Sequence, residues 1–385
     1  MGNQKPLKPA ALTKFYNGKK VLLTGHTGFK GAWLALWLSQ MGAKVYGYSL
    51  TEDPVPSAYT ALGIREIVQD ETIENLTHFE AVRGAIDRAQ PDVIFHLAAQ
   101  PLVRRSYDQP LETIQSNILG TAHILEALRL AQQKHRCALV MITSDKCYEN
   151  RGSVEGYCED DAMGGRDIYS MTKGACELLI ASYRESFFPT DSLERHGVAI
   201  ASARAGNVIG GGDYSEDRII PDCVRAFRQR NPIELRSPES VRPWQMVLDP
   251  LWGYLLLGVQ LSGGSASAYC GGWNFGPDAE STRRVRELVE LFGREYGLVS
   301  TSGRPYKIVQ ADMAKKEEVM LTLNIQKAKT SLQWIPRYSF ETAISETSQW
   351  YRKFEAGAPG EKMHTGIMRD YSLGQIKKYL DVMHE

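Results

Sequence analysis

Short apolar runs alternate with longer amphipathic segments over the first half of the chain. The runs have the length and composition of buried strands, and we predict such strands at 20–24, 45–49, 93–97, 138–142 and 198–204. Helical periodicity fills intervals between them, at 32–41, 79–90, 113–133 and 169–186. Strands and helices that alternate in this way form a parallel sheet covered on both faces. The pattern therefore predicts a doubly wound α/β fold, followed beyond Gly206 by a looser, Gly- and Pro-rich second domain.

The composition of the 385-residue chain narrows the classes of protein to which it can belong. Its 45 basic and 45 acidic residues give no net charge, so the overall electrostatics do not favour nucleic acid or an anionic membrane as partner. The six cysteines lack the spacing of metal ligands, and we expect reduced thiols and no metal site. Residues 1–17 lack the apolar core of a signal peptide, and no apolar run is long enough to span a bilayer. We expect a soluble cytoplasmic protein.

Polar residues are predicted to gather at the carboxyl end of the strand 138–142. Four of them follow it directly: Thr143, Ser144, Asp145 and Lys146. Ligands of open α/β sheets bind at this end of the strands. Tyr169 and Lys173 lie four residues apart, so on a helix they share one face directed at the same cleft. A tyrosine becomes a usable base when a nearby ammonium group stabilises its phenolate, and the combination indicates an active site.

A glycine-rich loop follows the first predicted strand and opens the first helix. Gly25, Gly28 and Gly31 suit a turn with positive φ, a close approach to a pyrophosphate and tight packing of the helix on the sheet. Amide groups at the helix N-terminus would bind the phosphates. The second strand ends in Ser49, without the acidic residue that often binds the ribose of NAD and without an Arg for a 2′-phosphate. The loop alone also fits an ordinary tight turn, but its place between strand and helix favours a cofactor site.

Together these motifs resemble those of the extended short-chain dehydrogenase/reductases, and most closely the CDP-glucose 4,6-dehydratase branch of that family. The matching segments follow the family order: 24–31, 96–107, 143–148, 163–169, 207–213 and 242–244. The resemblance implies NAD as cofactor and a nucleotide sugar, with CDP-glucose favoured, as substrate. It implies a Rossmann domain at 17–206, to which 241–273 returns, and a sugar-nucleotide-binding domain formed by 207–240 and 274–385.

The resemblance also implies roles for individual residues. The expected cofactor contacts are Gly25, Thr27, Gly28, Phe29, Lys30, Gly31, Ser49, Asn75, Leu76, Leu97, Ala98, Ala99, Thr143, Tyr169 and Lys173. The expected substrate contacts are Gln100, Arg104, Ser144, Arg204, Asn207, Arg218, Arg242 and Asn274. Arginine suits a diphosphate because its guanidinium binds phosphate in a bidentate manner. Two positions depart from the family pattern: Asn75 aligns with an Asp that contacts adenine, and Met246 stands in place of a His near the nucleotide.

The implied reaction is an internal redox cycle that removes water across C5 and C6 of the sugar. Tyr169 takes the proton of the C4 hydroxyl, Ser144 binds the same oxygen, and Lys173 is expected to lower the pKa of Tyr169. The elimination also needs an acid and a base, and here Asp145 and Lys146 stand where the dTDP-glucose dehydratases have an Asp-Glu pair. Lys146 either acts as a neutral base or stays charged and stabilises the enolate, and the sequence leaves both roles open.

Other interpretations remain compatible with the sequence. A dehydratase of another nucleotide sugar has the same motifs, and a sugar-nucleotide 4-epimerase also oxidises C4 but needs no acid–base pair. A non-catalytic NAD-binding protein can share the fold. By resemblance, the helices 113–131 and 169–186 form the interface of a homodimer or larger homo-oligomer; the alternative is that both simply pack on their own sheet. The expected setting is deoxysugar biosynthesis for lipopolysaccharide O-antigen.

Overall fold

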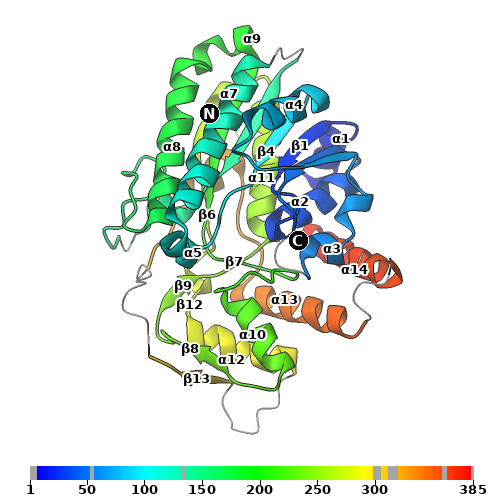
Figure 1. Ribbon diagram of the computed structural model, residues 1–385, viewed down its shortest axis with the longest axis vertical. Coiled ribbons are helices and arrows are strands. Elements are labelled where there is room, and N and C mark those ends of the chain that lie inside the picture. The colour runs from blue at the N-terminus through cyan, green and yellow to red at the C-terminus, as the bar shows by residue number, and fades with distance from the viewer. Residues whose placement is uncertain are drawn as a thin grey trace.

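Seven strands form the central sheet of the protein (Figure 1). The computed structural model describes residues 7–52, 56–131, 135–153, 155–297, 305–310, 320–357 and 362–382. The strands lie in the order β11 (Gly271–Phe275), β6 (Val198–Ala205), β5 (Cys137–Ile142), β4 (Val93–His96), β1 (Lys20–Thr24), β2 (Lys44–Ser49) and β3 (Asp70–Ile73). All neighbouring pairs in this sheet are parallel. The predicted parallel sheet is confirmed, and β3 and β11 extend it beyond the predicted strands.

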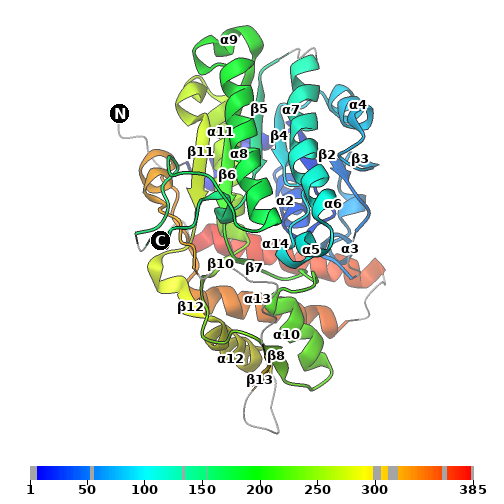
Figure 2. The same cartoon turned by 60° about the vertical axis from the view of Figure 1, so that its left-hand side comes forward.

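Helices cover both faces of the sheet (Figure 2). One face carries α2 (Phe29–Gln40) and α11 (Leu248–Ser262), with α1 (Pro9–Tyr16) and α14 (Lys362–Asp381) outside them. The other face carries α4 (Phe79–Ala89), α7 (Gly120–Leu130) and α8 (Ile168–Ser186). Val21 and Leu23 join the first of these two cores and Leu22 joins the second, as the two-residue period of a strand requires. Burial on both faces explains why the central strands are continuous apolar runs.

The strand order reverses at β1, which places the loops after β1 and β4 on either side of a crevice. β1 is hydrogen-bonded to β2 on one side and to β4 on the other. In an open α/β sheet the crevice outside the carboxyl ends of the strands at such a reversal is the usual ligand site. The glycine loop leaves β1 at this point, and the segment beginning at Leu97 leaves β4.

A smaller domain lies against the carboxyl edge of the sheet, in the lower part of Figure 1. Its helices are α10 (Ile219–Arg228), α12 (Val285–Tyr296) and α13 (Phe340–Glu355). Its short strands pair as β7 (Val208–Ile209) with β10 (Gln245–Met246), β8 (Ile233–Leu235) with β13 (Tyr306–Ile308), and β9 (Val241–Pro243) with β12 (Thr282–Arg284). The short helices α3 (Ala58–Ala61), α5 (Val103–Asp108), α6 (Pro110–Ile114) and α9 (Leu193–His196) complete the α-helices of the described residues.

Three elements lie across the predicted domain boundaries. β11 continues to Phe275, past the predicted end at 273, because its pairing with β6 extends to Ala205. β9 lies at the start of the predicted returning segment but pairs with β12 of the smaller domain. Helix α14, predicted in the smaller domain, packs both on α13 of that domain and on α2 and α3, where Tyr379 meets Trp37 edge-on at 5.8 Å between ring centroids. Within the described ranges, no helix has the length and apolar character needed to cross a membrane.

Candidate active site

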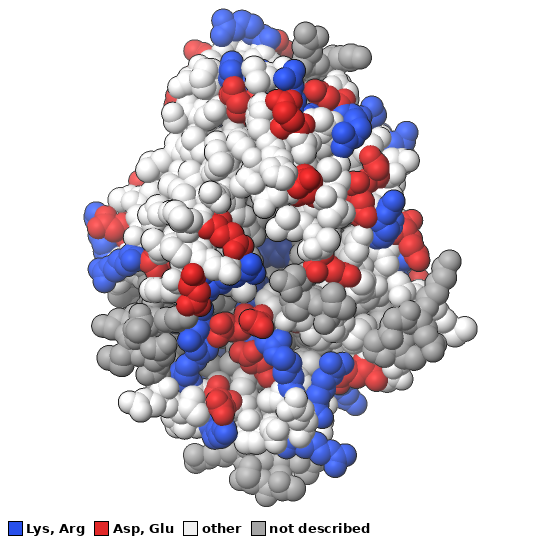
Figure 3. Space-filling view, in the orientation of Figure 1, with Lys and Arg blue, Asp and Glu red and all other residues white. Residues whose placement is uncertain are grey.

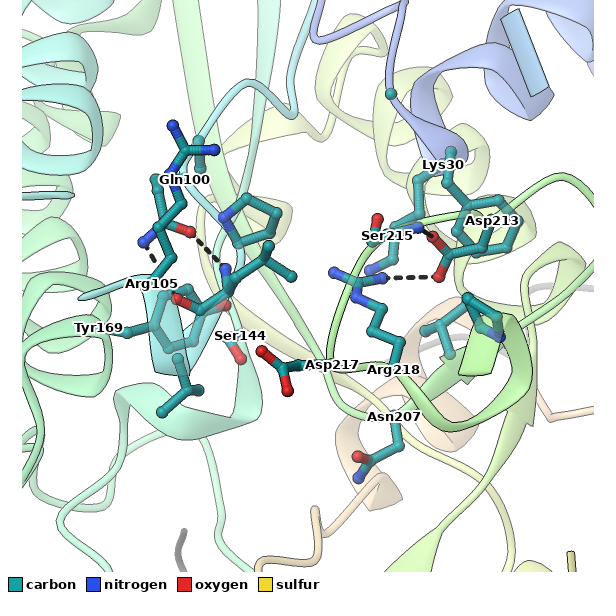
Figure 4. Close-up of a pocket in the computed structure, with 18 of the residues that line it drawn as sticks. Lys30, Gln100, Arg105, Ser144, Tyr169, Asn207, Asp213, Ser215, Asp217 and Arg218 are labelled. Carbon is teal, nitrogen blue, oxygen red and sulfur yellow. Dashed lines mark hydrogen bonds and ion pairs between the residues drawn. The ribbon is translucent and has the colours of Figure 1, made fainter. Parts of the chain in front are cut away.

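A cavity of about 980 Å³ lies between the carboxyl edge of the sheet and the smaller domain. Figure 3 shows its opening near the middle of one face, with basic and acidic side chains gathered beside it. In Figure 4, Gln100, Ser144 and Tyr169 lie on one wall, opposite Lys30, Asp213 and Arg218. All predicted catalytic and cofactor residues line this cavity, as do the predicted substrate residues Gln100, Arg104, Ser144, Asn207, Arg218 and Arg242.

The glycine loop has the geometry required to approach a pyrophosphate. Gly25 has φ +78°, and a Cβ at this position would lie 2.8 Å from the backbone nitrogen of Ala98. A Cβ at Gly31 would lie 1.9 Å from the carbonyl oxygen of Gly25, so both positions exclude a side chain. Helix α2 begins just after Gly28, which has no side chain to cap the free amide groups of the first turn. These donors line the cavity and fit the phosphates of a dinucleotide.

At the end of β2, beyond the glycine loop, the cleft is lined by hydroxyl groups and not by a carboxylate that could bind a ribose. The Thr27 and Ser49 hydroxyls are hydrogen-bonded at 2.6 Å, and both residues line the cavity. Asn75 also lines it, but its side-chain oxygen accepts a hydrogen bond from the Thr77 amide at 2.9 Å. Asn75 therefore stabilises the turn that follows β3 through its side-chain oxygen. Its predicted hydrogen bond to adenine would have to come from the side-chain NH₂ group.

Tyr169 and Lys173 enter the cleft from the first turns of α8, whose N-terminus is capped by Asp167. The Lys173 ammonium lies 5.8 Å from the centroid of the Tyr169 ring. Burial raises the pKa of Tyr169 to about 12, while a hydrogen bond with Ser144 acts in the opposite direction. Burial also lowers the pKa of Lys173. The expected lowering of the Tyr169 pKa by Lys173 is not seen: burial dominates, and the groups that oppose it are Ser144 and then Arg218.

Asp145 and Lys146 lie in a single 3-10 turn that follows β5. Asp145 is buried, and its carboxylate accepts a hydrogen bond from the Ser144 hydroxyl at 2.8 Å. Burial raises the pKa of Asp145 although Lys146 and Ser144 favour its charged form. A Cβ on Gly206 would lie 2.6 Å from the Asp145 carboxylate, so this glycine leaves room for the side chain. A buried carboxyl with a raised pKa is suited to donate a proton.

Lys30 has a lowered pKa that its place in the glycine loop does not predict. Its pKa is lowered to about 7, first by burial and then by the positive charges of Arg218 and Lys173, while Asp145 acts in the opposite direction. Its ammonium lies 5.9 Å from the centroid of the Tyr254 ring. Sequence motifs predict Lys30 as a cofactor contact only, because the three neighbouring charges come from distant parts of the chain.

Gln100 lines the cleft, but its side-chain amide mainly holds the surrounding loop. It donates a hydrogen bond to the Thr113 hydroxyl at 2.9 Å, and its backbone amide donates to the Asn117 side chain at 2.8 Å. Asn117 also donates to the Thr172 hydroxyl at 2.9 Å, next to Lys173. Asn117 lies in a π-helical turn at Gln115–Leu119 that interrupts the predicted helix 113–133. This turn, which the sequence pattern missed, positions the loop after β4 against α8.

Arg204 and Asn274 do not line the cavity, which corrects their prediction as substrate contacts. Arg204 is 4 % exposed and forms an ion pair with Glu177 at 2.7 Å. The Tyr148 hydroxyl accepts a hydrogen bond from Arg204 at 2.6 Å and donates one to Asn274 at 2.7 Å. Glu177 also accepts a hydrogen bond from the Thr143 hydroxyl. The two residues thus belong to a buried network that supports the turn carrying Ser144 and Asp145.

We expect Arg204→Met to lower the free energy of unfolding by roughly 3–5 kcal/mol, because it leaves the Glu177 carboxylate buried without its cation. Urea titration followed by circular dichroism measures the change. Arg129→Met is the matched control: Arg129 pairs with Glu126 at 2.6 Å on the surface, and its loss is expected to cost less than about 1 kcal/mol. Equal losses in the two variants would contradict the importance of the buried network.

The sequence matches a family model described as GDP-mannose 4,6 dehydratase over residues 22–347, and the chain belongs to this family. A CDP-glucose 4,6-dehydratase from Salmonella typhimurium is 42% identical to it over 348 residues, which cover 89% of this chain and 93% of that protein. A dTDP-glucose 4,6-dehydratase from Xanthomonas campestris is 22% identical over 277 residues, which cover 70% of this chain and 75% of that protein. These matches confirm the predicted family.

Solved structures share the fold at lower sequence identity. The epimerase Mth375 from Methanothermobacter thermautotrophicus has a TM-score of 0.73 and 22% identity, over 90% of this chain and 95% of that chain. The dTDP-glucose 4,6-dehydratase from Bacillus anthracis, solved in complex with NAD, has a TM-score of 0.70 and 20% identity, over 87% of this chain and 97% of that chain. The likeness confirms the predicted fold class, a Rossmann sheet with an added domain.

Proposed function

We propose that the protein catalyses the NAD-dependent 4,6-dehydration of CDP-glucose to CDP-4-keto-6-deoxyglucose. The observation that carries this proposal is the buried Asp145 beside Lys146, in the same cleft as Ser144, Tyr169 and Lys173. Oxidation at C4 needs only the last three residues, whereas the loss of water needs the further acid and base. The 42% identity to a CDP-glucose 4,6-dehydratase over 89% of this chain supports the same reaction and nucleotide.

The residues of the cleft fit NAD. The free amide groups at the start of α2 would hold its pyrophosphate, the Thr27 and Ser49 hydroxyls would bind the adenosine ribose, and Lys173 would bind the nicotinamide ribose. The NAD complex of the dTDP-glucose 4,6-dehydratase from Bacillus anthracis supports this choice. When bound, the cofactor supplies the acceptor for the C4 hydride and the donor that returns it to C6.

Each proton transfer of the reaction is assigned to a different residue near Tyr169. Tyr169 removes the proton of the C4 hydroxyl while Ser144, its hydrogen-bond partner, binds the same oxygen. The resulting 4-keto group acidifies the hydrogen on C5. Asp145, whose pKa is raised by burial, then donates its proton to the departing C6 hydroxyl. Lys146 has one of two roles: it takes the C5 proton and later returns it to C5, or it stays charged and stabilises the negative enolate while another base takes and returns that proton. The return of the proton to C5 restores the 4-keto group.

The test is incubation of the purified protein with NAD⁺ and, separately, with CDP-, dTDP-, GDP- and UDP-linked hexoses, followed by mass spectrometry. Loss of one water from the CDP-linked substrate alone is the expected result. Water loss from another substrate would favour a dehydratase of that nucleotide sugar. An isomer of unchanged mass would favour a sugar-nucleotide 4-epimerase and remove the proposed role of Asp145 and Lys146. No reaction with any substrate would contradict the proposal.

We also propose a cytoplasmic homodimer that serves deoxysugar biosynthesis for lipopolysaccharide O-antigen. Large apolar side chains remain exposed on α6 to α8, where Leu111 is 72 % and Leu178 is 63 % exposed. Exposed leucines on neighbouring helices favour an interface between subunits. The mass of the protein in solution, from light scattering, tests the dimer.

A further inference from the structure

One loop of the smaller domain places two carboxylates among the arginines of the cleft. Asp217 lies 3.3 Å from the Arg104 guanidinium and 3.2 Å from that of Arg236. Asp213 lies 3.1 Å from Arg218. Arg104 belongs to α5 at the edge of the sheet, whereas Arg236 follows β8 of the smaller domain, so Asp217 bridges the two sides of the cleft. Figure 4 shows Asp217 between the two walls.

The backbone at Asp217 adopts a conformation that few side chains tolerate. Its φ is +55°, in the left-handed region, which is unfavourable for a residue other than glycine. Aspartate and asparagine accept this conformation better than most residues. The position of the Asp217 carboxylate is therefore specified by the loop at an energetic cost, and such outliers concentrate at functional sites.

The ion pair between Asp217 and Arg236 is weak enough to be exchanged, because their side chains are 39% and 36% exposed and such exposed ion pairs contribute little to stability. The Arg104 side chain is 19% exposed, so water and ligands also reach the second ion pair of Asp217. A diphosphate offers the same arginines more charge and more acceptor oxygens than one carboxylate, and it can bind a guanidinium in a bidentate manner. An anionic ligand that enters the cleft would therefore replace Asp217 as the partner of these arginines.

We propose that Asp217 is an internal counter-ion that occupies Arg104 and Arg236 until the diphosphate of the nucleotide sugar replaces it, and that Arg236 is a ligand of this diphosphate. The inference rests on the proposed function for the class of substrate, a sugar linked to a nucleoside diphosphate, but not for the identity of the base. It adds Arg236, which lines the cavity, to the arginines that the sequence motifs predict.

Calorimetric titration of the full-length protein with CDP and with cytidine tests the inference. Because a competing charge is removed, we expect Asp217→Asn to bind CDP roughly 3–10-fold more tightly. Asparagine keeps the size and the left-handed backbone of Asp217. Arg236→Met is expected to weaken CDP binding by about 10-fold. Both variants should bind cytidine, which has no phosphate, as the unchanged protein does.

Glu239→Gln is the matched control, because it removes one acidic charge from the smaller domain at a side chain paired with Arg286, outside the cavity lining. It should leave CDP affinity unchanged. When Arg236→Met is already present, adding Asp217→Asn should increase CDP affinity by less than it does in the unchanged protein, because Arg236, one of the two arginines that Asp217 occupies, is gone. Shrinkage of the gain supports the exchange, and a gain of full size contradicts it.

Unchanged or weaker CDP binding by Asp217→Asn would overturn the inference, since Asp217 would then not compete with the diphosphate. Unchanged binding by Arg236→Met would remove Arg236 from the site. If the protein binds UDP, GDP or dTDP instead of CDP, the same fold-changes with that nucleotide would support the inference while contradicting the proposed base. If no nucleoside diphosphate binds, the inference and the proposed function are both wrong.

Discussion

Tyr169→Phe is expected to reduce turnover by roughly 10²–10⁴-fold, the usual contribution of a positioned acid–base group. The substitution keeps the ring, which packs in the first turn of α8, and removes only the hydroxyl that faces Ser144. Without this hydroxyl, no group in the same position can take the proton from C4. NAD⁺ affinity should change little, because the glycine loop and Lys173 remain. Product formation by mass spectrometry and NAD⁺ titration by calorimetry measure the two effects separately.

Tyr254→Phe provides the control for Tyr169→Phe. Tyr254 is fully buried in α11, and no protein group in the described part of the chain bonds its hydroxyl. Loss of the Tyr254 hydroxyl should leave turnover within a few-fold of the unchanged protein. If Tyr169→Phe retained full turnover, Tyr169 would not be the base. An equal loss of turnover and of NAD⁺ affinity in Tyr169→Phe would instead indicate that the variant disturbs the cofactor site.

The hydrophobic pattern predicted the centre of the fold and missed its edges. β1, β4, β5 and most of β6 are buried on both faces, so each is a continuous apolar run. Among the residues that the structure describes, β3 pairs only with β2, and its charged residues Asp70 and Glu71 leave no apolar run to detect. The π-helical turn at Gln115–Leu119 was also missed, because a change in the backbone hydrogen-bond pattern leaves the helical periodicity almost intact.

Two predicted residues that directly follow a central strand line the cleft, whereas two predicted residues in the middle of central strands do not. Ser144 and Asp145 come immediately after β5, so the position of the strand end is enough to bring them to the cleft. Arg204 and Asn274 lie inside β6 and β11, where they are partners in the pairing of the two strands. The direction of their side chains depends on this register and on Glu177 of α8, neither of which the sequence reveals. An arginine inside a strand of the central sheet is therefore a weaker prediction than a polar residue that follows such a strand.

Lys146→Ala is expected to reduce formation of the dehydrated product by at least about 10²-fold, the lower range for loss of an acid–base group. Oxidation at C4 should still proceed slowly, because Tyr169 and Lys173 come from α8 rather than from the turn that holds Lys146. The protein would then stop with the cofactor reduced. Absorbance at the wavelength of reduced nicotinamide, together with mass spectrometry of the sugar, measures both steps in one reaction. Lys44→Ala, an exposed lysine at the amino end of β2, is the control.

Running the Lys146→Ala reaction in D₂O separates the two roles that remain open for Lys146. If Lys146 is the base, the variant cannot remove the C5 hydrogen, and the recovered sugar should contain no deuterium at C5. If Lys146 stays charged and only stabilises the enolate, another base acts, and slow incorporation of deuterium should persist. Asp145 is the neighbouring carboxyl that could take over, since it lies in the same turn. Normal product formation by Lys146→Ala would exclude both roles and leave Asp145 as the group that separates this cleft from that of an epimerase.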